Sequence, residues 1–426
     1  MEFGDELRRR RVAAGLSLRD LSCLVHYSRG HLSKVETGRA IASIELVRLC
    51  DSALGSGGTL VGMAASALGR RRDASRKKEG GPLMSGDPGM RWPVPPARED
   101  LMPSGMSMIA IAIPSPDRIS SSQAESAATT FTVLFSQLRQ LGQQVFPAAL
   151  LPTLIAQTQT LRGLAAAARN PARSILLGLA ARYAEYTGWI AQEMGEDHAA
   201  LWWTDRAVRM AEAAGQPEMG AYALVRRALV GMYRGDAAET IDLARMAQAD
   251  PRASERVRGL AALREAQGYA LTADGGPCHK ALERGREHLA RAANDPAADM
   301  LGTSTVADPA AMVTGWCLHD LGRPADAAAV LDREITRLPD DAHKARTRFA
   351  ARRALAYAVA GEVDHACQLT SGLLTDAQNL SSATIRLDLV RLSRALNRWP
   401  SHAPVRSLQP DLNRALRPLA RQFAED

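Results

Sequence analysis

The sequence predicts an all-α protein in which a small N-terminal bundle precedes a long array of paired helices. First, the chain is rich in Ala, Leu and Arg and only 4% aromatic, a composition that favours helices over strands. Second, short segments near the N-terminus begin with Ser and continue with helical apolar spacing, as helix starts do. Third, glycines recur roughly every 40 residues in the second half of the chain, which is typical of helical repeats.

Charge divides the chain unevenly. The 426 residues are enough for two or three domains. Residues 1–78 hold 15 Lys/Arg against 8 Asp/Glu, whereas the remainder holds 38 of each. A basic excess confined to the N-terminus predicts a polyanionic partner for that part alone.

The sequence contains few signals for targeting to a membrane or for disulfide chemistry. The N-terminus has no apolar stretch typical of a secretory signal, and the most apolar run, residues 106–113, is too short to cross a bilayer. The five cysteines form no Cys-x-x-Cys pair, and Cys23 and Cys50 fall on or near apolar helix faces. We therefore expect buried thiols and a cytoplasmic, nucleoid-associated protein without a membrane partner.

The first predicted helix covers about Asp5–Ala14. Leu7, Val12 and Ala14 are expected to face inward, with the four arginines of residues 8–11 on the outside. A second helix follows, with Ser17 as its N-cap. Its expected apolar residues are Leu18, Leu21, Leu24 and Val25.

The stretch Ser28–Gly38 predicts a third short helix. Ser28 is a suitable N-cap, Leu32 and Val35 lie three apart on one face, and Gly38 provides the stop. Only His26 and Tyr27 separate it from the second helix, and its outer face carries Arg29, His31 and Lys34. Two short helices joined by a tight turn, the second basic outside, indicate a helix-turn-helix. A fourth helix begins after Ser43 and ends at the glycine-rich residues 55–58.

Residues 4–54 resemble the DNA-binding domain of the Cro/CI repressor (XRE) type. The shared features are the turn Gly15-Leu16-Ser17, the pair Leu21-Ser22 and the ending Val35-Glu36-Thr37-Gly38. Two positions differ from the family: Leu18 stands where relatives often carry a phosphate-contacting Gln, and His26 replaces the usual turn Gly.

The helix-turn-helix spacing assigns DNA contacts to the third helix. Arg can hold guanine with two hydrogen bonds, and Lys a little over one turn further can reach a base or phosphate. The alternative is that these are solvated surface charges. The expected base-contacting residues are Arg29, Gly30 and Lys34, and the expected phosphate-contacting residues are Ser17, Ser28, His31 and Arg39.

A linker, residues 69–119, is expected after a DNA-binding domain of residues 1–68. It is basic at its start, in residues 70–78, and rich in proline later. Two interpretations of the basic cluster are open: a solvated tether, or an additional phosphate contact beside the operator.

Residues 120–426 are expected to form a repeated helix-turn-helix array, an α-solenoid. Helices near residues 124–140 and 150–169 would lead the array, and 387–396 and 412–424 would end it. In each repeat a turn glycine is followed five residues later by a small residue. The pairs are Gly195 and Ala200, Gly235 and Thr240, Gly276 and Ala281, Gly322 and Ala327, and Gly361 and Ala366.

The repeat units, best seen in residues 321–331, resemble degenerate tetratricopeptide repeats with a lengthened loop. The whole arrangement resembles actinobacterial regulators with a Cro/CI-type domain, a linker and a tetratricopeptide-like sensor, most closely over residues 183–190 and 203–207. The resemblance implies transcription control by a ligand or partner. We expect a homodimer on a double-stranded DNA operator, with a small-molecule or peptide effector.

Aromatic residues gather on the first helices of the repeats. Trp189 and Trp316 each precede a turn glycine by six residues, and in tetratricopeptide-like stacks this side tends to line the concave groove. One interpretation is an aromatic ligand groove; the other is ordinary packing between repeats. The candidate groove residues are Arg182, Tyr186, Trp189, Tyr222, Arg226, Trp316 and His319.

Enzyme motifs are not found. The sequence has no His-Glu-x-x-His, Gly-x-Ser-x-Gly or Walker loop and no metal-ligand spacing. We expect no catalytic residue, no metal and no cofactor. The alternative function is a protein-interaction scaffold whose repeats are tethered to DNA by the N-terminal domain.

Overall fold

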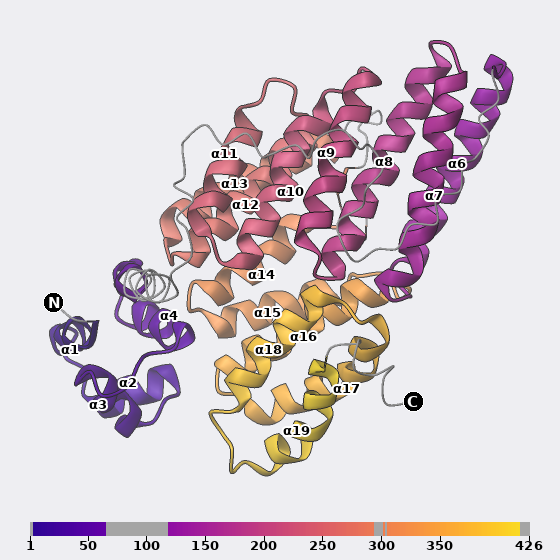
Figure 1. Ribbon diagram of the computed structural model, residues 1–426. Coiled ribbons are helices and arrows are strands. Elements are labelled where there is room, and N and C mark those ends of the chain that lie inside the picture. Colours follow the sequence, from indigo (N-terminus) through magenta and orange to yellow (C-terminus); the bar gives the residue numbers. More distant parts are fainter. Residues whose placement is uncertain (1–2, 65–117, 294–300, 303–304, 418–426) are drawn as a thin grey trace, which may run out of the picture.

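A computed structural model describes residues 3–64, 118–293, 301–302 and 305–417, and this part of the chain is α-helical without strands (Figure 1). It has a small N-terminal bundle, residues 3–64, which we call the head. The repeat region, residues 118–417 apart from the gaps just given, follows it. The apolar run 106–113, the basic cluster 70–78 and nearly all of the predicted linker lie outside the described residues.

Serine caps build the head as predicted. The helices are α1 (Phe3–Ala13), α2 (Leu18–Val25), α3 (Arg29–Glu36) and α4 (Ile44–Ala53), and residues 59–64 are also helical. The side chains of Ser17, Ser28 and Ser43 each accept a backbone N–H in the first turn of α2, α3 and α4. These bonds satisfy N–H groups that have no partner within the helix.

The inward face of α1 differs from the prediction. Leu7 is fully buried, but Val12 is 60% exposed and Ala14 is also exposed. Arg11 is buried instead, because it lies four residues after Leu7 and so shares its face of the helix. The arginines therefore do not all lie outside.

The buried face of α2 also differs from the prediction. Val25, four residues after Leu21, is buried, whereas Leu24 is 53% exposed. Cys23 is exposed as well, so the expectation of a buried thiol was wrong there, although the other four cysteines are buried.

A buried ion pair fixes α1 against α3. Arg11 donates from Nε to Glu36 Oε1 at 2.7 Å and from Nη2 to Oε2 at 2.8 Å, and its Nη1 donates to the Leu16 carbonyl at 2.8 Å. The Glu36 carboxylate raises the pKa of Arg11 further. One guanidinium thus joins α1, the end of α3 and the turn before α2.

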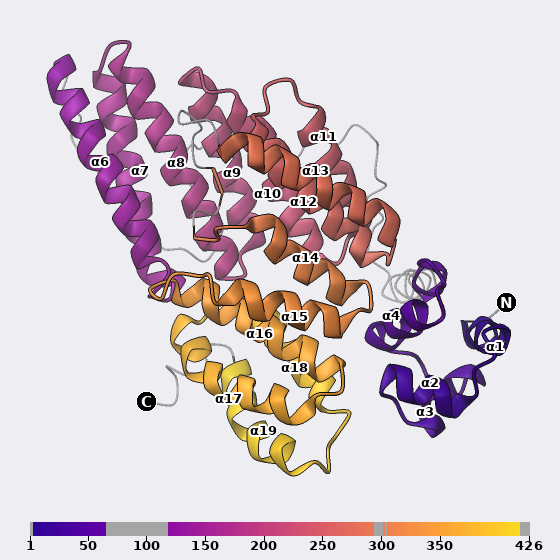
Figure 2. The same cartoon turned by 180° about the vertical axis from the view of Figure 1, so that it is seen from behind.

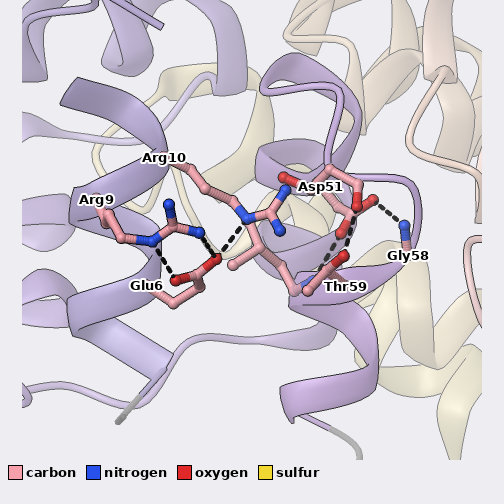
Figure 3. A network of polar contacts seen from close by, with 8 residues as sticks. Glu6, Arg9, Arg10, Asp51, Gly58 and Thr59 are labelled. Carbon is pink, nitrogen blue, oxygen red and sulfur yellow. Dashed lines mark hydrogen bonds and ion pairs between the residues drawn. The ribbon is translucent and has the colours of Figure 1, made fainter. Parts of the chain in front are cut away.

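Two further carboxylates form polar contacts within the head (Figure 3). Glu6 accepts hydrogen bonds from Arg9 and Arg10, and these contacts lower the pKa of Glu6 to about 2. Asp51 is buried and accepts the backbone N–H groups of Gly58 and Leu60 at 2.7 and 2.8 Å. It therefore caps the helical residues 59–64.

The repeat region is a succession of antiparallel helix pairs. Its helices are α6 (Ser121–Leu141), α7 (Pro147–Ala167), α8 (Ala172–Glu193), α9 (Asp197–Ala213), α10 (Glu218–Arg234), α11 (Ala237–Ala249), α12 (Glu255–Leu271), α13 (Gly275–Ala293), α14 (Pro309–Asp320), α15 (Pro324–Ile335), α16 (His343–Val359), α17 (Val363–Leu380), α18 (Ala383–Leu396) and α19 (Ala403–Leu416). The predicted leading and closing helices are present, although α19 begins at Ala403 and residues 418–424 are not described.

Four of the five predicted turn glycines lie between paired helices with positive φ: Gly195, Gly235, Gly322 and Gly361. Gly276 does not. It lies inside α13, and the turn before α13 is made by Ala273 with a φ of 57°. The five small residues that follow are all at most 2% exposed, so the second helix of each pair approaches its partner through them.

The repeat region curls so that its end meets its beginning (Figures 1 and 2). Glu193, at the end of α8, is 2% exposed and accepts hydrogen bonds from Ser382 at 2.5 Å and Thr384 at 2.9 Å. Nearby, the Gln143 carbonyl accepts the N–H of Lys344 at 2.9 Å. These contacts bring α16 and α18 against the ends of α6 and α8.

We predict that Arg11→Met lowers the free energy of unfolding of the head by about 3–5 kcal/mol, because it leaves the Glu36 carboxylate buried without its cation. Hydrogen exchange of the α3 amides in the full chain measures the change. Arg9→Met is the control: its side chain is 59% exposed, and solvent screening should leave its ion pair with little effect on stability. Equal α3 protection in both variants would contradict a structural role for the buried pair.

Candidate nucleic-acid interface and ligand cavity

The outer face of α3 is open to solvent. Arg29, Lys34 and Arg39 are exposed, while Leu32 and Val35 of the same helix are buried in the head. At Gly30, no described atom lies within 4 Å of where a Cβ would stand. The predicted base-contacting residues therefore share one accessible surface of the helix, as a recognition helix requires.

The predicted phosphate-contacting residues lie at the borders of this surface. Ser28 is exposed and caps α3 through the N–H of His31, and the His31 ring stacks on Tyr27 with centroids 5.6 Å apart. Ser17 is also exposed, but its hydroxyl and N–H both bond with Asp20. That carboxylate lowers the positive potential that a phosphate would meet at Ser17.

The side of the head away from α1 packs on the repeat region (Figures 1 and 2). In α4, Arg48 donates to Asp320 at the end of α14 at 2.7 Å, with only 12% and 1% of the two side chains exposed. Asp320 remains ionised because the nearby cations, Arg48 first, lower its pKa despite burial. The ion pair joins residues that are 272 positions apart.

A second contact holds the turn between α2 and α3. The guanidinium of Arg398 lies 4.0 Å from the ring centroid of Tyr27 and 4.5 Å from that of Trp399. Its Nη2 donates to the carbonyl of His26 at 2.5 Å. His26 has a φ of 54°, the left-handed conformation that Gly adopts most readily. The residues that lead into the candidate recognition helix are thus held by the repeat region.

Turns of successive helix pairs form the surface that receives the head. A Cβ at Gly322 would clash with the carbonyl of Arg48, and one at Gly361 would lie 2.7 Å from Nδ1 of His26. A Cβ at Gly58 would likewise lie too close to the carbonyl of Thr272. We call this surface, formed by the turns within pairs α12–α13, α14–α15, α16–α17 and α18–α19, the turn edge.

A cavity of about 840 Å³ lies inside the curl of the repeat region. Six of the seven predicted groove residues line it: Arg182, Tyr186, Trp189, Tyr222, Arg226 and Trp316. His319 is not among the lining residues. It follows Trp316 by about one turn of α14, outside the lining of the cavity, where the charges of Asp320 and Arg48 act on it.

The aromatic residues form two sides of the cavity. On α8, Tyr186 and Trp189 stack with centroids 5.7 Å apart. On α14, Trp316 meets Tyr233 edge to face at 5.9 Å, and the guanidinium of Arg352 packs on the Trp316 ring. Both tryptophans occupy the same repeat position, and the curl brings the two positions to one cavity.

Three polar side chains form a buried cluster in the wall of the cavity. The Tyr222 hydroxyl donates to Glu185 Oε1 at 3.3 Å, and Arg226 Nε is 3.6 Å from the same oxygen. Burial raises the pKa of Tyr222, so the hydroxyl stays protonated.

Helix α16 adds residues that the sequence did not identify, chiefly Lys344 and Arg348. They lie four apart and therefore on one face of the helix. The available signal was two basic residues at helical spacing within the repeat array, but the position of α16 against α8 depends on the curl.

The family model described as a helix-turn-helix domain matches residues 2–62. The comparisons find no similar curated protein and no similar solved structure. The match, the serine-capped α2 and α3 and the exposed basic face of α3 together support a DNA-binding regulator.

The described residues hold no group of three His, Cys, Asp or Glu side chains placed to bind a metal ion. Among the helices of that same part of the chain, none has the length and apolar character to span a bilayer.

We predict that His319 makes the stability of the folded chain sensitive to acid. Burial lowers its pKa to about 4 from an ordinary 6.5, so between these values the unfolded chain takes up a proton that the folded chain does not. Because of this residue, the free energy of unfolding should fall by about 2 kcal/mol between pH 7 and pH 5. Urea unfolding at both pH values measures the difference.

His319→Gln should remove this part of the pH dependence, whereas His343→Gln, at an exposed position, should keep it. An unchanged difference in the His319 variant would contradict the assignment.

Proposed function

We propose that this protein is a sequence-specific transcription regulator of the Cro/CI type, which inserts α3 into the major groove of an operator. The supporting observation is the orientation of the head. The basic face of α3 is exposed, while α4 and the turn before α3 contact the repeat region.

In this proposal Arg29 reads guanine through two hydrogen bonds, and Lys34 contacts a base or a phosphate a little over one turn further. Gly30 allows close approach of the helix because it has no side chain. Ser28, His31 and Arg39 border this face and contact phosphate, and Ser17 makes the weakest phosphate contact because Asp20 accompanies it.

The protein acts as a homodimer in this proposal. Residues 3–64 carry nine Lys/Arg against six Asp/Glu, a modest excess that supplies few phosphate contacts. Two heads on successive major-groove sites, about 34–36 Å apart, would bind far more tightly through effective concentration.

The repeat region, which resembles tetratricopeptide repeats, is the proposed sensor. Helix α14 supports this role because it takes part in both sites: Trp316 lines the cavity, and Asp320, one turn further, holds Arg48 of the head. An effector that displaces α14 would alter the position of the head, and hence the spacing of two α3 helices in a dimer.

We expect Arg29→Ala to cost about 1–3 kcal/mol in operator binding and to relax the preference at one base pair. The operator is first obtained by sequencing genomic fragments that the purified protein retains, and affinity is then measured by fluorescence anisotropy. Arg286→Ala, an exposed arginine on α13, is the matched control. Unchanged affinity and base preference in the Arg29 variant would place the recognition surface elsewhere.

The ion pair between head and repeat region should be energetically coupled. In a double-mutant cycle of Arg48→Met and Asp320→Asn, urea unfolding should give a coupling energy of about 1–3 kcal/mol. Each single variant should also raise hydrogen exchange in α4, because the partner charge loses its counterion. Additive effects of the two substitutions would show that the pair does not hold the head.

A further inference from the structure

The charges around the cavity do not balance. Three carboxylates line it, and each already accepts hydrogen bonds from the protein. Glu185 accepts from Tyr222, Glu193 from Ser382 and Thr384, and Asp341 from Gln140. The same lining holds six basic side chains, so positive charge is in excess: Arg139, Arg182, Arg226, Arg264, Lys344 and Arg348.

Several cations of the lining have only neutral hydrogen-bond partners among the described residues. Arg139 donates to the carbonyl of Gly302 at 2.7 Å, Arg264 to the amide oxygen of Gln267 at 2.5 Å, and Arg348 to the hydroxyl of Tyr233. Burial lowers the pKa of Arg264 to about 10, still far above neutral pH, so its charge persists.

Lys344 is the clearest case. It is 2% exposed, lines the cavity, and its Nζ has no hydrogen-bond partner in the described part of the chain. The ammonium group lies 5.1 Å from the ring centroid of Trp189. Burial lowers the pKa of Lys344, and the charge of Glu193 offsets only part of this effect. A buried cation without a hydrogen-bonding anion is unfavourable, and a bound anion would satisfy it.

The size and the apolar lining limit the kind of anion. A volume of about 840 Å³ lies in the range of sites for organic ligands, far larger than an inorganic ion requires. Aromatic rings stand on both sides: Tyr186 and Trp189 on α8, and Trp316 and Phe349 on α14 and α16. Flat rings of this kind favour a ligand with its own flat apolar group.

We propose that the cavity binds a small organic anion with an aromatic or conjugated ring system. Its charged group pairs with Lys344 and Arg348, and its ring packs against Trp189 or Trp316. The binding of such an anion does not depend on the proposed function. Its role as the effector of the proposed sensor does rest on that function.

A pair of fluorescent probes tests the ligand class on the full chain. 1-Anilinonaphthalene-8-sulfonate carries a sulfonate on an aromatic frame, and N-phenyl-1-naphthylamine is its neutral counterpart. We expect the sulfonate to bind one per chain and more tightly than the amine. Lys344→Met should weaken sulfonate binding about tenfold or more, with little change for the amine.

The matched control is Lys280→Met, an exposed lysine on α13, which should leave both dissociation constants unchanged. Lys344→Arg retains the charge and should retain the preference for the anion. Equal affinity for the two probes, or sulfonate binding that is indifferent to Lys344→Met in a folded variant, would overturn the proposal. Far-ultraviolet circular dichroism establishes that the variant is folded.

A measurement on the unmodified chain keeps the proposal testable should Lys344→Met not fold. 1-Naphthoate should displace the bound sulfonate probe, and its near-isosteric neutral amide should not. Displacement by both alike would overturn the anion preference. Adding 1-naphthoate to the operator-binding assay then separates the two proposals: displacement of the probe without a change in operator affinity supports the ligand class and contradicts sensing.

Discussion

The contact between Glu193 and α18 is the constraint on which the rest of the architecture depends. A buried carboxylate is costly unless it is fully hydrogen-bonded, and here Ser382 and Thr384 provide those bonds from a position nearly 190 residues further along the chain. The contact closes the curl of the repeat region. Together with the hydrogen bond from the Lys344 N–H to the Gln143 carbonyl, it places α16 opposite α8, and the cavity thereby has two aromatic sides.

The curl also explains why one helix can serve two sites. Helix α14 lies with Trp316 toward the cavity and Asp320 toward the head, and Arg352 packs on Trp316 while pairing with Asp388 of α18 at 2.8 Å. Both carboxylates are almost completely buried. Close packing of this kind transmits displacements, because a core has few alternative arrangements. The cavity and the head are thus joined by short, direct contacts between packed side chains.

Local signals predicted most of the fold, whereas distant contacts escaped prediction. The caps at Ser17, Ser28 and Ser43 and four turn glycines could be read directly, since they depend on neighbouring residues. The shared repeat position of Trp189 and Trp316 left a groove and packing between repeats both open, and the curl places both residues at one cavity. The errors at Val12, Leu24, Cys23 and Gly276 arose where helix phase was misjudged by one or a few residues. The burial of Arg11, the ion pair of Arg48 and the place of Lys344 in the cavity depend on partners 25 or more positions away, which no local pattern encodes.

The turn edge restricts where this chain can change length during evolution. Its turns touch the head so closely that even a methyl group at Gly322 would meet the backbone of α4. An inserted residue there would displace the head. Homologous chains that retain this docking should therefore keep the lengths of these turns nearly constant.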